Sequence, residues 1–288
     1  MAKTVNHIPE DIQPNSQKTP PRAADCHLHI VDGRFPLVAK AAAPPDATLA
    51  DYRLLQKRLG TEKAVIVQAK CFGTDNSCIL SAIEELGKEK ARGVAVVHPD
   101  TSKAELCDLD KRGVTGIRFS VWNHHDAVTS IDMIEPLAKR IADFGWHVQL
   151  LMLGGQIAAN APMLDRLPCP LVFDHMCRLP LESGVNHPSF KIVCHLLEKG
   201  NTWIKLSAAY QNRLIGAPSY ADAGIIAKAF AAIAPERVVW GSDWPHVTEK
   251  IKPDGAFLLK LLEEWFNDEN MLKKILADNP AALYKWPV

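Results

Sequence analysis

The sequence predicts one closed (β/α)8 barrel, and three observations support this fold class. Eight short apolar segments, most of them rich in valine, isoleucine and leucine, recur along the 288 residues, as expected of parallel strands buried on both faces. Longer segments of helical periodicity lie between them. No long linker interrupts the alternation, which favours one barrel over two domains.

The expected elements follow one another along the chain. Strands are expected at residues 24–32, 64–70, 93–99, 116–122, 146–152, 171–177, 203–208 and 238–244. Amphipathic helices are expected at 49–60, 76–90, 131–144 and 220–234, and Gly60 is placed to cap the first of them. Residues 252–288 are expected to form one or two helices against the barrel wall, with Asn279 as an N-cap before Pro280.

The segment before the first strand differs from the rest. Its first 22 residues are polar and proline-rich and lack the apolar core of a signal peptide. We therefore expect a flexible N-terminal tail over residues 1–23 and the barrel over residues 24–288. No apolar run is long enough to span a bilayer, and a cytoplasmic location is expected.

An open, doubly wound sheet is the alternative architecture. Such a sheet ordinarily carries a glycine-rich nucleotide-binding turn after its first strand, and the stretch that begins at His27 is not one. In a closed barrel the carboxyl ends of all strands meet at one mouth. Five residues far apart in the sequence would then be neighbours: His27, His29, Arg118, His175 and Asp243.

Charge and cysteine content restrict the function classes. Lysine plus arginine equal aspartate plus glutamate at 33 each, so the chain lacks the charge of a nucleic-acid or membrane-surface binder. Its seven cysteines show no CxxC pairing, which indicates a reducing compartment. Two of these cysteines, Cys26 and Cys177, lie next to histidine motifs. Strand alternation turns Cys26 away from the face of His27, whereas Cys177 shares the face of His175 and is the better of two weak nucleophile candidates.

A pair of histidines and a distant aspartate are the main catalytic candidates. His27 and His29 share one strand face, where two imidazoles can hold a metal or polarise a carbonyl, unless they are ordinary core or surface histidines. In the motif Trp240-Gly-Ser-Asp-Trp-Pro-His246, Asp243 follows a buried strand. A carboxylate in an apolar setting beside imidazoles is suited to take a proton from water, although a turn aspartate is the other interpretation.

Charged and polar residues at the same mouth suggest substrate binding. Alternation lets only one of Asp174 and His175 point into the barrel and puts the other in the wall. Arg118 lies inside an apolar strand and either forms a structural ion pair or, together with Arg178, binds an anionic substrate bidentately. The residues expected to orient that substrate are Gln68, Lys70, Thr74, Tyr210, Arg213 and His246, and Lys205 lies beside Tyr210 and Arg213 after the seventh strand.

Five motifs, in order, resemble the amidohydrolase superfamily. They are Asp-Cys-His-Leu-His, Val-Gln-Ala-Lys-Cys-Phe-Gly-Thr-Asp-Asn, Gly-Ile-Arg-Phe, Val-Phe-Asp-His-Met-Cys-Arg and Trp-Gly-Ser-Asp-Trp-Pro-His. The similarity is greater to the branch of 2-pyrone-4,6-dicarboxylate lactonases and sugar-lactone lactonases, which includes D-galactarolactone isomerase. It runs from about Ala24 to Tyr284. Each motif is weak alone, and together they are specific to that branch.

The resemblance implies which residues form the site and whether the site needs a metal. It implies that His27, His29, His175 and Asp243 stand at the barrel mouth. Metal-dependent relatives add a lysine or glutamate on the fourth strand and a histidine on the fifth, where this chain has Arg118 and Leu151. The resemblance therefore implies catalysis without a metal. The alternative is a single divalent ion, such as Zn²⁺, held by the same three histidines and Asp243.

The expected function is hydrolysis of the ester bond of a small carboxylated lactone, either 2-pyrone-4,6-dicarboxylate-like or derived from a sugar acid. Asp243 would activate water while the histidines and Arg118 polarise the carbonyl. The alternatives are a sugar-acid lactone isomerase, a metal-dependent decarboxylase and, from another class, a non-catalytic barrel that binds a small molecule. The sequence carries no signal for the particular lactone or for an oligomeric state.

Overall fold

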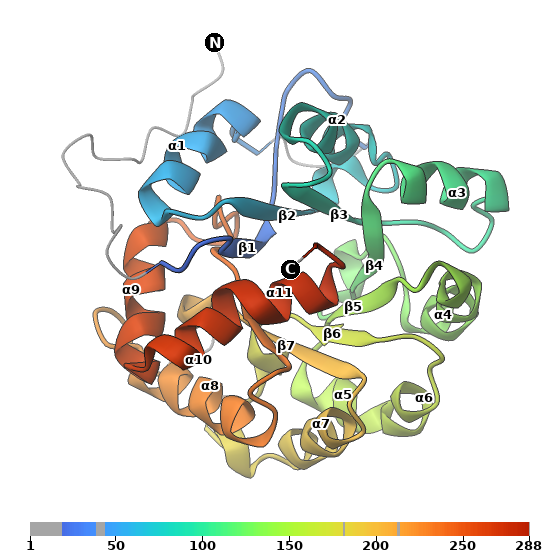
Figure 1. The fold of residues 1–288 in the computed structure, drawn as a ribbon. Coiled ribbons are helices and arrows are strands. Elements are labelled where there is room, and N and C mark those ends of the chain that lie inside the picture. Colours follow the sequence, from blue (N-terminus) through green and yellow to red (C-terminus); the bar gives the residue numbers. More distant parts are fainter. Residues whose placement is uncertain (1–18, 39–43, 181, 212–213, 288) are drawn as a thin grey trace.

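Eight parallel strands form one barrel in the computed structural model, and their order around the barrel follows the chain (Figure 1). The structure describes residues 19–38, 44–180, 182–211 and 214–287. The strands are β1 Ala24–Leu28, β2 Lys63–Val67, β3 Ala91–Ala95, β4 Val114–Ser120, β5 His147–Leu151, β6 Leu171–Phe173, β7 Thr202–Leu206 and β8 Val238–Trp240. The barrel closes where the amide of Asp243 donates to the carbonyl of His27 and that of His29 donates to the carbonyl of Trp244, both over 2.8 Å. The closed barrel is confirmed over the open sheet.

Helices separate the strands and form the outer layer (Figure 1). They are α1 Leu49–Leu59, α2 Ser77–Leu86, α3 Lys103–Lys111, α4 Ile134–Ile141, α5 Gly154–Ala159, α6 Ala161–Asp165, α7 Pro188–Glu198, α8 Ala221–Ile233, α9 Gly255–Phe266, α10 Glu269–Lys273 and α11 Asn279–Leu283. The cap at Gly60 is confirmed, because its φ of 71° lies in the left-handed region that glycine adopts without strain.

The two faces of the strands belong to different parts of the core. Outward-facing residues such as Ile66 and Phe173 pack against the helices in the larger cluster. Inward-facing valines such as Val65 and Val239 pack with Tyr284 and Trp286, which follow α11. Figure 1 shows α10 and α11 crossing this end of the barrel. The C-terminal segment therefore closes the amino end of the barrel, which leaves the carboxyl end for the site.

The C-terminal helices differ from the expectation at one residue. The chain is already helical before Pro280, because α10 continues through the π-helical turn Lys274–Asp278 into α11. Asn279 is therefore not an N-cap. Its side-chain amide instead donates to the carbonyls of Pro235 and Val238, at 2.9 and 2.7 Å, and so joins α11 to the start of β8.

Residues 19–23 of the expected tail lie against the barrel, whereas residues 1–18 fall outside the described residues. Ala23 is fully buried, and the hydroxyl of Thr19 donates to the carbonyl of Leu59 over 2.9 Å. Across the described part of the chain, no helix has both the length and the apolar character needed to cross a membrane.

Candidate active site

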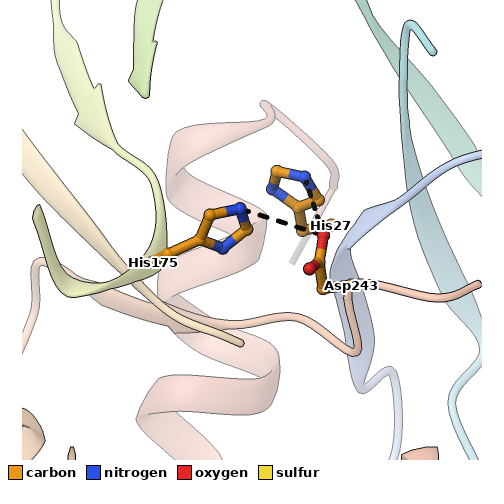
Figure 2. A group of neighbouring side chains, drawn as sticks. All are labelled: His27, His175 and Asp243. Atoms are coloured by element: carbon orange, nitrogen blue, oxygen red, sulfur yellow. Dashed lines mark ion pairs between the residues drawn. The ribbon is translucent and has the colours of Figure 1, made fainter. Parts of the chain in front are cut away.

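Asp243 stands at the centre of a group of imidazoles at the carboxyl end of the barrel. Its Oδ1 lies 3.5, 3.7 and 3.9 Å from the Nε2 atoms of His27, His29 and His175, respectively. Figure 2 shows the rings of His27 and His175 near Asp243, with a dashed line from each to this oxygen. All four side chains are buried. Burial lowers the pKa of His29 to about 4 and that of His175 to about 3, so these rings are neutral near pH 7.

The second oxygen of Asp243 is held from the other side. The hydroxyl of Tyr210 donates to Oδ2, and Nδ1 of His246 lies 3.3 Å from that hydroxyl. Burial raises the pKa of Asp243, and His29, Tyr210 and Arg118 oppose this effect. The carboxylate therefore has one fixed oxygen and one oxygen that faces the imidazoles, as a general base requires.

A register change in β1 sets the position of His27. The pairing of β1 with β2 shifts between Asp25 and Leu28. As a result, His27 contacts Lys205 inside the barrel while Cys26 also packs among the inward-facing residues. The expected orientation of Cys26 away from His27 is therefore wrong, because a bulge interrupts strand alternation. Burial raises the pKa of the Cys26 thiol and of the Cys177 thiol, so neither is a ready nucleophile.

The segment after β6 brings two neighbouring residues into the barrel. Asp174 follows the alternation of the strand, and His175–Arg178 then forms a 3-10 turn whose four φ angles are between 41° and 65°. This left-handed turn points His175 at Asp243, and Ser207 fixes its Nδ1 over 2.8 Å. The expectation that one of Asp174 and His175 lies in the wall is therefore wrong. Four consecutive left-handed residues without glycine are strained, a feature that clusters at functional sites.

Asp174 is the centre of a second, deeper network. Its Oδ2 accepts from Nε of Arg118 over 3.0 Å and from the amide of Gln149 over 3.2 Å. Burial alone would raise the pKa of Asp174, but the ring of His27 and the cations of Arg118 and Lys205 hold it well below its usual value. Arg118 thus has the anionic partner that its place in an apolar strand requires.

Asp25 ties the first strand to the last one behind the site. Its carboxylate accepts from the amide and hydroxyl of Ser242, at 2.8 and 2.6 Å, and from the hydroxyl of Tyr52 over 3.3 Å. Burial raises its pKa to about 6. Because Ser242 immediately precedes Asp243, these bonds fix the backbone from which the base projects.

A cavity of about 660 Å³ opens above Asp243. Among the residues that the structure describes, three cationic side chains line it, those of Lys70, Arg118 and Arg178, and one acid, Asp243. The guanidinium of Arg178 lies 4.4 Å from the centre of the Trp122 ring, which orients it at the cavity edge. The positive charge of this lining matches a small anion better than a neutral molecule.

Other predicted substrate residues lie elsewhere. The side-chain amide of Gln68 donates to the carbonyls of Gly73 and Asp75, at 3.2 and 2.6 Å, and so supports the loop that carries Lys70. Thr74 is exposed on that loop and does not line the cavity. Tyr210 and His246 stand behind Asp243 instead of lining the cavity. Arg213 lies outside the described residues.

Sequence reasoning missed some residues of the site. Gln149, on β5, bridges Lys205 and Asp174. The sequence feature that could have indicated this role is a polar residue at an inward-facing position of an apolar strand. Ser207, which holds His175, carried no signal beyond its place after β7. Lys205 lies in the sequence beside residues that are expected to orient the substrate, but in the structure it is fully buried beneath the cavity.

The donor atoms of His27, His175 and Asp243 lie within 4.8 Å of one another, as metal ligands do. One hydrogen bond, that between His27 and His29, opposes a metal at His27. Nδ1 of His29 donates to the carbonyl of Val67 over 2.9 Å, which leaves Nε2 of that neutral ring without a proton. The 3.3 Å hydrogen bond between Nε2 of His27 and Nε2 of His29 then needs its proton on His27. The histidine and aspartate side chains are of the types that bind zinc, but the proton on Nε2 of His27 is incompatible with a zinc ion bound to that nitrogen.

The barrel carries the buried carboxylate of Asp243 and a cationic cavity at its carboxyl end, where (β/α)8 enzymes have their active sites. The amidohydrolase family model matches residues 24–286. This chain belongs to the amidohydrolase family.

Curated relatives fall within one branch of that family. The chain is 34% identical to the 4-sulfomuconolactone hydrolase of Rhizobium radiobacter, over 94% of this chain and 92% of the relative. It is 33% identical to the 2-pyrone-4,6-dicarboxylate hydrolase of Comamonas testosteroni, again over 94% and 92%. It is 28% identical to the D-galactarolactone isomerase of Agrobacterium fabrum, over 92% of each. An apo crystal structure from Agrobacterium tumefaciens superposes with a TM-score of 0.85 at 28% identity, over 96% of this chain and 99% of that one.

Proposed function

We propose that this protein hydrolyses the ester bond of a small, carboxylated lactone. The observation that carries the proposal is the surrounding of one Asp243 oxygen by three neutral imidazoles beneath a cavity lined by three cations. Relatives that act on sulfomuconolactone and on pyrone dicarboxylate support the substrate class. Sulfonate and carboxylate groups both match the charge of the cavity.

Substrate binding uses the rim of the cavity. Arg178, oriented by Trp122, and Lys70 bind the carboxylates of the lactone. Arg118 approaches from the fourth strand, and because its Nε is already bonded to Asp174, its remaining N–H groups serve the substrate. In this proposal the ester carbonyl of the bound lactone lies above the imidazoles.

Hydrolysis then proceeds through the chain's own groups. Asp243 takes a proton from water, and the resulting hydroxide attacks the ester carbon. His175 and Arg118, which both line the cavity, stabilise the negative charge on the carbonyl oxygen. When the ring C–O bond breaks, the carboxylic acid of Asp243 returns its proton to the departing alkoxide or enolate. The product is the ring-opened acid.

The proposal includes neither a metal nor a membrane partner. Arg118 and Lys205 supply the positive charge that a metal supplies in other amidohydrolases. We further propose a cytoplasmic location, because the seven cysteines are all unpaired thiols.

A pH-indicator assay on a lactone panel tests the proposal. The panel comprises pyrone dicarboxylates, muconolactones and aldonolactones, assayed after exhaustive chelation, with Asp243→Asn as the inactive control. Acid release from a carboxylated lactone by the parent protein alone is the expected result. No acid release from any lactone, with a new lactone signal by NMR, would instead establish isomerisation, which the relative from Agrobacterium fabrum favours as the second candidate. Stoichiometric binding without any product would overturn both.

A further inference from the structure

Lys205 is a fully buried lysine beneath the cavity, on the inward face of β7. Its ammonium donates to Oε1 of Gln149 over 2.7 Å and lies 3.4 Å from Nδ1 of His27. Burying an ammonium group is costly unless it is paired. Because Lys205 does not line the cavity, a direct contact with substrate does not explain its retention there.

The hydrogen bonds around His27 form a chain with one direction. Val67 accepts from Nδ1 of His29, so Nε2 of His29 accepts from Nε2 of His27. A neutral His27 then has no proton on Nδ1, and that nitrogen accepts from the ammonium of Lys205. Protons therefore point from Lys205 through His27 and His29 to the carbonyl of Val67.

Asp174 is the competing partner of the same nitrogen. Its Oδ1 lies 3.2 Å from Nδ1 of His27, but this oxygen has no aligned hydrogen bond among the described residues. Oδ2 of Asp174 accepts from Arg118 and from the amide of Gln149. Because Gln149 must turn its carbonyl oxygen to Lys205 and its amide to Asp174, it holds the ammonium in place beside His27.

We propose that Lys205 is a positioning residue that keeps the proton of His27 on Nε2, the nitrogen beside Asp243, and thereby keeps this nitrogen from binding a metal. A metal on Nε2 would move the proton to Nδ1, where the N–H group would face the ammonium of Lys205.

Nitrogen-15 NMR of the histidine rings in the full-length protein tests the proton position directly. Long-range ¹H–¹⁵N spectra of the chelated protein, assigned by loss of signals in His27→Gln and His29→Gln, should show a protonated Nε2 and a bare Nδ1 for His27. His29 should show the reverse pattern. A neutral His27 protonated on Nδ1, or a ring protonated on both nitrogens, would overturn the proposal. This spectrum on the parent protein decides the matter even if lysine variants fold poorly.

Removing the ammonium supplies the second test. In Lys205→Met, His27 should shift to the form protonated on Nδ1, which donates to Asp174. The affinity for Zn²⁺, measured by competition with a chromophoric chelator, should rise by about tenfold or more, the scale on which partners of metal ligands act. The matched control is Lys63→Met, which removes a strand lysine that lies over Trp286 at the far end of the barrel. It should leave both readouts unchanged.

An unchanged His27 tautomer or an unchanged zinc affinity in folded Lys205→Met would overturn the role of Lys205. Neither readout involves a lactone. The expected spectra and zinc affinities without hydrolysis of any lactone would therefore reject the proposed function alone, whereas hydrolysis with the opposite tautomer would reject only the role of Lys205.

Discussion

At the scale of single residues, the site holds two carboxyl groups in different environments. Asp243 is the acid exposed to the cavity, and its pKa is raised by burial. Asp174 lies deeper and is held ionised by cations. Environments that push the pKa values of two carboxyls apart suit them to different roles: Asp174 neutralises the buried cations, and we propose that Asp243 transfers protons.

Replacing Asp243 with asparagine should abolish most of the activity without unfolding the protein. An amide accepts no proton near neutrality, so kcat should fall by about 10²–10⁴-fold. Because burial raises the pKa of Asp243, kcat/KM of the parent should rise with pH as the carboxyl ionises and fall on its acid side. Stopped-flow assays across pH, together with the thermal transition of both proteins, check this. A folded Asp243→Asn protein with near-parental kcat would place the base elsewhere.

Replacing Arg178 with methionine should selectively weaken binding of anionic lactones. Loss of one charged hydrogen bond should raise KM by on the order of tenfold or more. Arg118→Met should have the same effect on KM and should also lower stability, because it leaves Asp174 without its guanidinium partner. The control is Arg166→Met, in which the lost arginine pairs with Glu135 at the surface. Equal losses for charged and neutral lactones would mean that Arg178 has a structural role.

At the scale of elements, short departures from regular strands assemble the site. The bulge in β1 aims His27 inward, the left-handed turn after β6 aims His175, and the bonds of Asp25 hold the segment after β8. The strands themselves end sooner than expected, so His29, His175 and Asp243 lie in the segments just beyond them. Apolar composition continues past the last ladder bond and therefore did not reveal where the backbone turns.

Replacing Asp25 with alanine should destabilise the closure between β1 and β8. The change removes the carboxylate that accepts from three buried donors, the amide and hydroxyl of Ser242 and the hydroxyl of Tyr52. At roughly 1–3 kcal/mol for each unsatisfied group, the unfolding free energy should fall by about 3 kcal/mol or more. Urea denaturation measures this. Asp165→Ala, which removes an exposed carboxylate paired with Lys199, should cost under about 1 kcal/mol. Similar losses of unfolding free energy in both variants would mean that Asp25 does not stabilise the contact between β1 and the segment after β8.

At the scale of the whole molecule, the barrel separates stability from chemistry. Trp286 and Tyr284 fill the amino end of the barrel, and the polar groups are gathered at the carboxyl end. The interior changes from packed valines to a charged network along the barrel axis. Burying Arg118, Lys205 and Asp174 together is tolerable because each cation has an anionic or amide partner.

The proposed metal-free mechanism predicts that exhaustive chelation leaves the activity intact, because in that mechanism Arg118 and Lys205 supply the positive charge. Elemental analysis of the purified protein should find well under one metal per chain. The relevant comparison is activity before and after dialysis against a strong chelator, with and without added Zn²⁺. Stoichiometric zinc bound by His27 and His29, with activity lost on its removal, would overturn the metal-free mechanism.

Much of the fold of this protein could be predicted from its sequence alone. Periods of two and 3.6 residues are local signals, so the eight strands, the main helices and the barrel could be predicted. The order of strands then brought His27, His29, His175 and Asp243 to one mouth. What only the tertiary structure decided was orientation and pairing: the inward turn of both Asp174 and His175, the place of Tyr210 behind Asp243, and the contact of Lys205 with His27. These depend on a bulge, a strained turn and partners up to 178 residues apart, and no local pattern encodes which distant side chain will lie within hydrogen-bonding distance.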